Sequence, residues 1–396
     1  WLEFFSKMQG PRLGGIAVGP RPPLRRRPNG RTGSAHARVA PLKKVPMPEF
    51  YDDLHFENML TAITRQQRSF NRINLSKKFK FGNKVISRQH LKKSMDIFRD
   101  FVVEALNCFQ KHGEQLCYRK FNESMHEKFE AYKPIVKRGE RGYQEDKTLF
   151  TAYYSPDFKG SRVKTDIYKN PIYGLPKEKE LRNLTSDEIN FQKKLKGKGY
   201  ELFYVNDSLY DIWLLHVEGG GRVKVKNSDG TVDKFYLSYA GTNKKRFRML
   251  GNYMLEAGML RRDELSVDNQ RRYFLENPQH QREIMASNPS FVFFKESQNE
   301  PLGVRNVSLT PNRSMATDYR IYKEYGIISY IKARKPKREN ERVLLKEFSR
   351  FFINQDTGGA IKGNARADLY FGYGPYAELS ANYLYNLGEQ FFLILK

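Results

Sequence analysis

The sequence predicts a mainly β protein in which a helical region precedes the strands. Two apolar patterns with helical spacing occupy about residues 53–109, and after about residue 148 the chain changes to short apolar or aromatic runs separated by Gly, Pro, Asn and Asp. Hydrophobic residues make up 39% and aromatic residues 14% of the 396 residues, which is enough to build a folded core. We expect two to three domains from this length.

Residues 1–50 differ from the rest, because they are rich in Arg, Lys, Pro and Gly and lack apolar periodicity. This composition predicts a disordered basic leader. A tether to nucleic acid or to the cell envelope, a solvated tail and wrongly translated upstream sequence all remain open as explanations. The segment starts at Trp1 and shows no contiguous apolar core of a secretion signal, so the compartment has to be argued from function.

Two helices are predicted next. The first runs from Asp53, as its cap, to about Ile73, and the second opens at Ser87 and presents a broad apolar face from Leu91 to Phe109. Both patterns are typical of helices that pack on a core.

The strand-rich part follows, with a helical insert at Gly251–Asn277. The runs that predict strands are Leu149–Tyr153, Leu202–Val205, Ile212–Val217, Gly221–Val225, Lys234–Tyr239, Phe291–Phe294, Ile327–Ile331 and Gln390–Leu395.

Charge and cysteine content narrow the classes of function. Lys and Arg number 70 against 44 Asp and Glu, a net charge of +26, which favours a polyanionic partner such as nucleic acid, an anionic envelope polymer or a membrane surface. Two cysteines, Cys108 and Cys117, exclude a disulfide framework and a four-thiolate zinc site. We expect neither a metal nor another cofactor, and no apolar run reaches the length of a membrane-spanning helix.

The C-terminal stretch from Gln355 to Gly374 is the most informative for chemistry. It places two carboxylates, Asp356 and Asp368, around small residues that let a backbone approach a ligand. A carboxylic acid in a partly apolar setting, as Asp368 is beside Leu369-Tyr370-Phe371, can serve as a general acid near neutral pH. The alternative is that both residues only cap turns.

Further candidate residues bind polar or sugar groups. Arginine, hydroxyl and carboxylate side chains in one turn can hold hydroxyl groups, and tyrosines offer flat faces to sugar rings. Loop-holding ion pairs and strand-core packing are the alternatives. The candidate substrate-binding residues are Tyr153, Tyr154, Glu218, Arg313, Ser314, Asp318 and Lys362.

Taken in order, these segments resemble the MltA family of bacterial lytic murein transglycosylases, from about residue 53 to the C-terminus. One motif alone would be a weak sign, but eight in the same order are specific. The motifs are FTAYYSP at Phe150–Pro156, NPIYGLP at Asn170–Pro176, YELFYVND at Tyr200–Asp207, VEGGGRV at Val217–Val223, YAGTN at Tyr239–Asn243, NPSFVFF at Asn288–Phe294, LTPNRSMATD at Leu309–Asp318 and QDTGGAIKGNARADLYFGYG at Gln355–Gly374.

The resemblance implies a double-psi β-barrel domain built from two chain segments, with a smaller β-barrel domain inserted between them and a saccharide groove where they meet. The expected division is a leader at 1–50, a helical cap plus the first part of the barrel at 51–178, the inserted domain at 179–286 and the second part of the barrel at 287–396.

The resemblance also implies an activity. The enzyme would be a peptidoglycan lytic exotransglycosylase that cleaves the β-1,4 bond between N-acetylmuramic acid and N-acetylglucosamine without water and leaves 1,6-anhydromuramyl ends. By motif match, Asp368 would act first as acid and then as base. Asp356 would be a supporting carboxylate, and the seven binding candidates belong to the matching motifs.

The chain departs from the family at two motifs. Where the family usually has QGSGRV, this chain has EGGGRV at Glu218–Val223, and where the family has TGYYEP, this chain has TAYYSP. These changes touch the groove wall, so the preference for particular sugars can differ. The first cysteine, Cys108, lies in a predicted helix, so no lipid-anchoring motif is visible. We expect a monomer that acts on glycan strands in the periplasm, with peripheral association with the outer membrane left open.

Three alternatives remain. A non-catalytic cell-wall-binding protein would share the fold without the activity. An aspartic hydrolase is suggested by the single Asp356-Thr357-Gly358 triplet, although that chemistry needs two carboxylates that share a proton. A nucleic-acid-binding protein is suggested by the charge, but no recognition helix, zinc finger or RNA-binding strand motif accompanies it, and we expect no nucleic-acid partner.

Overall fold

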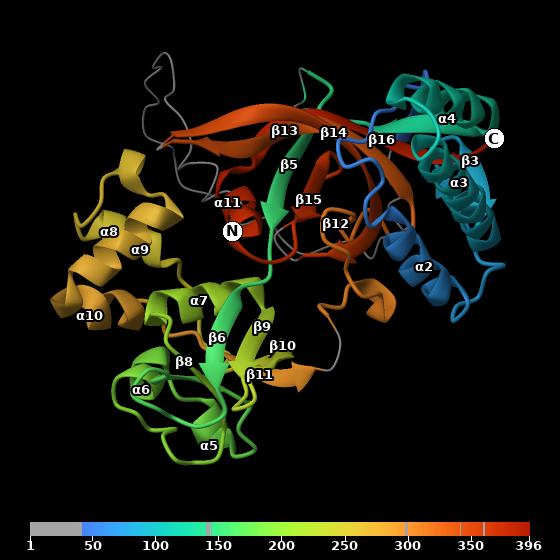
Figure 1. Ribbon diagram of the computed structural model, residues 1–396. Helices are drawn as coiled ribbons and strands as arrows, with labels where there is room; N and C mark the ends of the chain where they lie inside the picture. Colours follow the sequence, from blue (N-terminus) through green and yellow to red (C-terminus); the bar gives the residue numbers. More distant parts are fainter. Residues whose placement is uncertain (1–41, 140–142, 144, 298–299, 341, 359–360) are drawn as a thin grey trace, which may run out of the picture.

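The computed structural model describes residues 42–139, 143, 145–297, 300–340, 342–358 and 361–396. Its larger sheet has eight strands in the order β1-β4-β16-β13-β14-β12-β15-β5, and an additional pairing of β16 with β5 closes the last six into a barrel (Figure 1). The strands are β1 (Leu42–Val45), β4 (Phe129–Pro134), β5 (Thr148–Tyr153), β12 (Ser314–Thr317), β13 (Ile328–Glu339), β14 (Arg342–Thr357), β15 (Arg366–Tyr370) and β16 (Tyr385–Leu395).

The barrel is mixed rather than antiparallel throughout. β12 runs parallel to β14, and β15 runs parallel to β5, while the other neighbours are antiparallel. Two separate chain segments supply it, because β5 lies far before β12 in the sequence. This confirms the predicted fold class, a mainly β protein with a double-psi β-barrel domain and an inserted β domain.

The predicted leader extends too far toward the C-terminus. Residues 1–41 lie outside the described residues, but Leu42–Val45 form strand β1 against β4, and Phe50 is buried among Phe121, Tyr330 and Phe351. These few apolar residues were hidden among the charges and prolines of the leader. The pairing partner that orders them lies about 90 residues further along the chain.

A helical layer covers one side of the barrel (Figure 1). Ser87 caps the second predicted helix by accepting a hydrogen bond from the backbone of His90. The first helix begins at Met59, not near Asp53, and the Asp53 carboxylate binds Arg350. The layer contains α2 (Met59–Phe70), the hairpin β2 (Lys78–Phe81) and β3 (Lys84–Ser87), α3 (Arg88–Phe109) and α4 (Glu114–Lys128).

A single disulfide joins the end of α3 to α4, between Cys108 and Cys117. The sequence excluded a framework of several disulfides, but it did not indicate this bond. The two cysteines are nine positions apart, on opposite sides of the turn between the helices. The bond therefore fixes a local helical hairpin.

The inserted domain has its own six-stranded sheet in the order β11-β10-β9-β6-β8-β7. One isolated bridge between Gly174 and Phe294 connects the two edges of this sheet. Its elements are β6 (Asp157–Ser161), β7 (Asn170–Tyr173), α5 (Lys179–Arg182), α6 (Ser186–Asn190), β8 (Glu201–Val205), α7 (Leu209–Glu218), β9 (Gly220–Lys226), β10 (Val232–Thr242) and β11 (Val292–Ser297). The sheet thus extends beyond the expected range 179–286 on both sides.

One predicted strand is wrong: Ile212–Val217 belongs to helix α7. Ser208 opens this helix with a capping box, in which its hydroxyl and the Asp211 carboxylate each bind the other's backbone N–H. The run is apolar on every side because α7 is buried between the inserted sheet and a helical cluster. A fully buried helix and a buried strand have the same short apolar pattern.

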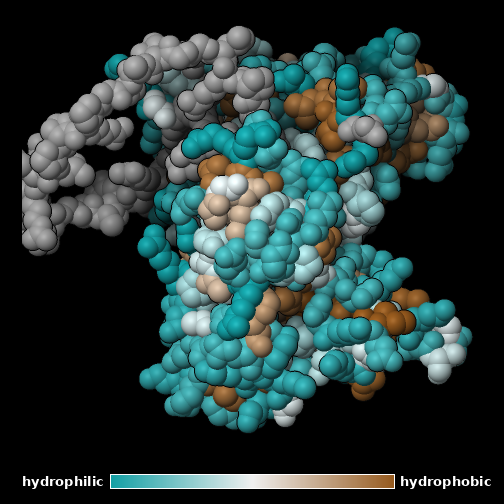
Figure 2. All heavy atoms as spheres, turned by 90° about the vertical axis from the view of Figure 1, so that its left-hand side faces the viewer, coloured by the Kyte–Doolittle hydropathy of each residue, from teal (hydrophilic) through white to brown (hydrophobic). Residues whose placement is uncertain are grey.

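The predicted helical insert is confirmed between β10 and β11. It contains α8 (Leu250–Glu256), α9 (Val267–Glu276) and α10 (Gln281–Ala286), with the 3-10 turns η1 (Arg262–Glu264) and η2 (Pro278–His280). The barrel carries α11 (Pro375–Tyr383) and the 3-10 turn η3 (Val304–Asn306). The surface on the side of α8–α10 is mostly hydrophilic (Figure 2), and among the described residues we find no helix with the length and apolar character needed to span a bilayer.

Candidate active site

A row of four residues across neighbouring barrel strands sets up the site. Ala316 of β12 pairs with Asp356 of β14 on one side and with Asp368 of β15 on the other, and Asp368 in turn pairs with Thr151 of β5. Laterally paired residues point to the same face of a sheet. The two predicted carboxylates therefore face the same cavity, and the small side chain of Ala316 leaves room between them.

Asp368 is held by a directed hydrogen-bond chain. The Thr151 hydroxyl donates to Oδ1 of Asp368 at 2.5 Å and accepts a hydrogen bond from the Arg366 guanidinium. Arg366 also donates to the carbonyls of Leu149 and Ala367, at 2.9 and 2.6 Å. Because a guanidinium can only donate, it fixes the direction of the Thr151 hydroxyl toward Asp368.

Asp356 is bound separately. The hydroxyl of Tyr153, two residues after Thr151 on β5, donates to Oδ2 of Asp356 at 2.7 Å. Residues two apart on a strand share a face, so one face of β5 supplies a hydrogen-bond donor to each carboxylate. The Tyr153 ring also lies 5.1 Å from that of Tyr370, centroid to centroid, which fixes its orientation.

The environment favours the protonated form of both carboxyls. Burial raises the pKa of Asp368, and the positive charge of Arg366 and the hydrogen bond from Thr151 oppose this only in part. Burial also raises the pKa of Asp356, to about 6, with a smaller contribution from the charge of Asp368 and opposition from the hydrogen bonds of Tyr153 and the Thr357 backbone. Groups of this kind exchange protons near neutral pH.

The cavity lies where the barrel meets the inserted domain and has a volume of about 280 Å³. The barrel contributes the carboxylates, α7 and α9 of the inserted domain contribute one wall, and α11 contributes another. The lining residues outside the four-residue row include Tyr153, Tyr154, Leu214, Val217, Glu218, Val267, Ala381 and Asn382. Ligand sites favour such domain boundaries.

An ion-pair bridge fastens these walls. Arg271 of α9 binds Asp211 of α7 through Nε at 2.7 Å and Glu378 of α11 through Nη2. Next to it, the Tyr383 hydroxyl of α11 donates to Asp268 of α9 at 3.0 Å. The inserted domain is thereby joined to the barrel beside the cavity.

The structure brings together five of the nine predicted site residues: Asp356, Asp368, Tyr153, Tyr154 and Glu218 all line this cavity. Their action on a saccharide stays a prediction.

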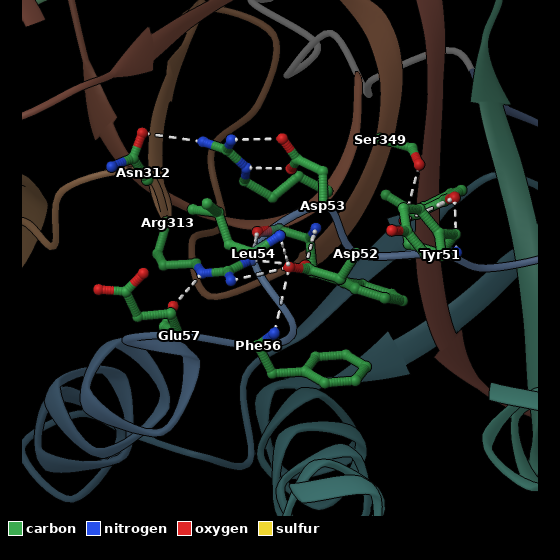
Figure 3. Close-up of polar contacts among 12 residues, drawn as sticks. Tyr51, Asp52, Asp53, Leu54, Phe56, Glu57, Asn312, Arg313 and Ser349 are labelled. Atoms are coloured by element: carbon green, nitrogen blue, oxygen red, sulfur yellow. Dashed lines mark hydrogen bonds and ion pairs between the residues drawn. The ribbon is translucent and has the colours of Figure 1, made fainter. Parts of the chain in front are cut away.

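Arg313 and Ser314 are corrections to the predicted binding set. Both side chains are completely buried. Arg313 forms a fork with the carboxylate of Asp52, at 2.6 and 2.9 Å, and binds the carbonyl of Glu57 at 2.7 Å (Figure 3). Ser314 donates to the Gln355 side chain at 2.6 Å. Both residues hold the barrel together and do not line the cavity.

Asp318 and Lys362 also lie outside the cavity lining. The Asp318 carboxylate is buried, pairs with Arg320 and accepts the backbone N–H of Gly363 at 2.9 Å. It therefore fixes the backbone at Gly363. The neighbouring residue Lys362 is exposed.

Sequence reasoning missed Thr151 and Arg366. Both lie inside the recognised motifs, and their spacing from a predicted site residue could have identified them. Arg366 precedes Asp368 by two residues on one strand, and Thr151 precedes Tyr153 by two on another, so each shares a face with a chosen residue. What the sequence could not supply was the parallel pairing of β5 with β15 that joins them.

Among the described residues, no group of three or more His, Cys, Asp or Glu side chains could hold a metal ion.

Comparisons with known proteins agree with this arrangement. The family model described as "MltA specific insert domain" matches residues 149–295, and the one described as "3D domain" matches residues 313–385. The membrane-bound lytic murein transglycosylase A of Vibrio cholerae is 34% identical over 251 residues, which are 63% of this chain and 66% of that protein. The chain belongs to the MltA family.

A second relative of the same name, from Escherichia coli K12, is 30% identical over 243 residues, or 61% of this chain and 64% of that protein. The matches thus span just under two thirds of the length of these two MltA relatives. Among solved structures, E. coli MltA with bound chitohexaose has a TM-score of 0.65 at 22% identity, covering 92% of this chain and 97% of that one. The lytic transglycosylase LtgG of Burkholderia pseudomallei has a TM-score of 0.57 at 23% identity, covering 91% and 99%.

Proposed function

We propose that this protein is a peptidoglycan lytic transglycosylase that cleaves the β-1,4 bond between N-acetylmuramic acid and N-acetylglucosamine and leaves a 1,6-anhydromuramyl end. The observation that carries the proposal is Asp368, a carboxyl with a raised pKa that faces a cavity between two domains. Support comes from the MltA relatives, both named lytic murein transglycosylases, and from the E. coli structure that holds chitohexaose.

Asp368 can perform both proton transfers in turn. As an acid it protonates the glycosidic oxygen, the bond from that oxygen to C1 of the muramyl residue breaks, and N-acetylglucosamine leaves with a free 4-hydroxyl. The resulting Asp368 carboxylate then takes the proton of the muramyl C6 hydroxyl, whose oxygen bonds to C1. The proton returns to Asp368, so no water is consumed and no second catalytic carboxyl is needed.

The neighbours of Asp368 have supporting roles in this scheme. Thr151 binds Oδ1, which leaves Oδ2 to carry the acid proton. Asp356, where it is ionised, stabilises positive charge that develops on the sugar ring, and Tyr153 fixes its position. The apolar residues Leu214, Val217 and Val267 give the cavity the low polarity that raises the pKa of Asp368.

We also propose that the protein works in the cell envelope, in the periplasm. Its substrate lies there, and the disulfide between Cys108 and Cys117 fits an oxidising compartment. The relatives' names, which include "membrane-bound", support an envelope location. Peripheral association with the outer membrane and a monomeric state stay predictions.

The test is mass spectrometry of purified peptidoglycan after incubation with the full chain. Wild type should release anhydromuramyl products, lighter by one water than hydrolysed ones. Asp368→Asn should lower turnover about a thousandfold, because general acid and base catalysis are both removed. Asp229→Asn, the same substitution at an exposed turn, should match wild type. Reducing-end products would mean a hydrolase, and the absence of any product would favour the binding-only alternative.

A further inference from the structure

Glu218 is a third carboxyl in the cavity, and its position is unusual for an ionised group. It is the last residue of α7, just before Gly219, which ends the helix in a left-handed conformation. The last carbonyls of a helix carry partial negative charge, which disfavours a carboxylate there. The side chain lines the cavity together with Asp356 and Asp368.

The groups that face Glu218 from the surrounding elements add negative rather than positive charge. Asp368 of β15 and Glu378 of α11 both act on it electrostatically. The cation Arg271 of α9 is already shared between Asp211 and Glu378. Glu218 therefore lacks a free cation among its described neighbours.

The remaining titratable neighbours do not change this balance. His216, on the same helix, packs against Phe291 and Phe294, and burial lowers its pKa to about 3, so it is neutral. Tyr154 interacts electrostatically with Glu218. Burial raises the pKa of the Tyr154 hydroxyl well above the ordinary value, so Tyr154 is neutral as well. Burial, followed by the charges of Asp368 and Glu378, raises the pKa of Glu218 well above its usual range.

We propose that Glu218 is a positioning residue that acts as a neutral carboxylic acid and donates a hydrogen bond to an acceptor oxygen of the sugar bound beside Asp368. A protonated carboxyl has an O–H to donate, whereas a carboxylate can only accept. The donor thus holds an N-acetyl carbonyl or ring hydroxyl oxygen that an ionised Glu218 would repel. This inference rests on the proposed transglycosylase activity and adds that the site needs two protonated carboxyls, Asp368 and Glu218.

The pH dependence of kcat/KM separates the two carboxyls. If both must be protonated, a logarithmic plot for wild type falls on its alkaline side with a slope that steepens from about −1 to about −2. Glu218→Gln keeps a donor of the same shape but cannot ionise, so its plot should keep a slope of about −1 and its activity at acidic pH should stay near wild type. Glu218→Ala should lose about tenfold in kcat/KM relative to Glu218→Gln at every pH, mainly through KM.

Glu276→Gln is the matched control, because Glu276 is an exposed residue at the end of α9 outside the cavity and the change of charge is the same. Its profile should equal that of wild type. Thermal unfolding of each variant confirms that differences in activity do not reflect loss of the fold.

The outcomes distinguish this inference from the proposed function. Anhydromuramyl products from wild type, together with an unsteepened alkaline side or with the same steepening in Glu218→Gln, would overturn the role of Glu218 alone. A loss in Glu218→Gln as large as that in Glu218→Ala would also overturn it, because a neutral donor would then not suffice. Absence of anhydromuramyl products from wild type would overturn both.

Discussion

Asp52 and Asp53 lie in arginine forks against the barrel, whereas Asp356, Asp368 and Glu218 face a cavity without an arginine fork of their own. In the first region Arg313 binds both oxygens of Asp52, and Arg350 binds both oxygens of Asp53 at 2.7 and 2.9 Å (Figure 3). In the second region the side chains that donate hydrogen bonds to the two aspartates carry hydroxyl groups, Thr151 to Asp368 and Tyr153 to Asp356. Carboxyl side chains are thus paired with arginines in one region and lack such pairs in the other.

The consequence is a difference in charge state. Burial alone would raise the pKa of Asp53, but the hydrogen bonds and charges of Arg350 and Lys335 outweigh it and lower the pKa. In the cavity burial prevails, and the pKa of Asp356 rises to about 6. Paired carboxylates stabilise the fold as fixed charges, and unpaired ones are available to carry protons.

The largest effect on stability is expected from breaking a fork. Arg313→Met leaves Asp52 buried without its countercharge, and loss of one partner of a buried pair costs about 3–5 kcal/mol of the free energy of unfolding. Urea unfolding measures it. Arg282→Met removes a mostly exposed arginine that pairs with Asp187 and should change stability by less than about 1 kcal/mol.

The same variant tests the two interpretations of Arg313. If it only holds the barrel, the folded fraction of Arg313→Met should turn over peptidoglycan with an unchanged KM. A raised KM with unaltered stability would restore it as a substrate-binding residue and would erase the distinction between the two regions.

The fold was predictable where a pattern is local. The apolar face of α3 and its cap at Ser87 need only neighbouring residues, and both are confirmed. Ile212–Val217 was misassigned because a helix buried on all sides has no polar face to reveal its period. The signal that remained was the Ser208 and Asp211 capping box.

The site was predictable only in part, for a related reason. Motifs selected Asp368 and Tyr153, but they also selected Arg313, which lies one residue before strand β12 and points to its structural partner Asp52 instead of the cavity. Strand registers decide which motif residues face the cavity, and registers depend on pairing between distant segments. For the same reason the sequence did not join Arg366 and Thr151 to Asp368.

An opposite response to pH is expected from neutralising one carboxylate in each region. The ionised form of Asp53 contributes stability above its unfolded pKa, and this is lost as pH falls through its lowered folded pKa. Asp356 is the reverse: its folded pKa of about 6 exceeds the ordinary value of 3.8, so the native state loses stability as pH rises from about 4 to about 6. The shift of about two units corresponds to about 3 kcal/mol.

Asp356→Asn should therefore stabilise the protein at pH 7 by up to about 3 kcal/mol and have little effect at pH 4, whereas Asp53→Asn should destabilise it at pH 7. Urea unfolding at pH 4, 5, 6 and 7 measures both. Equal signs for the two variants at pH 7 would show that the regions do not differ in the way the contacts indicate.

The smallest effect is expected from the hydroxyl that partly offsets the burial of Asp356. Tyr153→Phe removes the donor to Oδ2 and keeps the ring against Tyr370. Because this hydrogen bond favours the ionised form, the pKa of Asp356 should rise further, by about one unit, for a difference of about 1.4 kcal/mol between its protonation states. Carbon-13 NMR of the Asp356 carboxyl follows the titration. Tyr200→Phe removes a comparable tyrosine contact with Glu178 outside the cavity and should leave the titration unchanged. An unaltered pKa in Tyr153→Phe would mean that this hydroxyl does not contribute to the proton affinity of Asp356, and the cavity would then differ from the forks by its missing arginines and not by its hydroxyl partners.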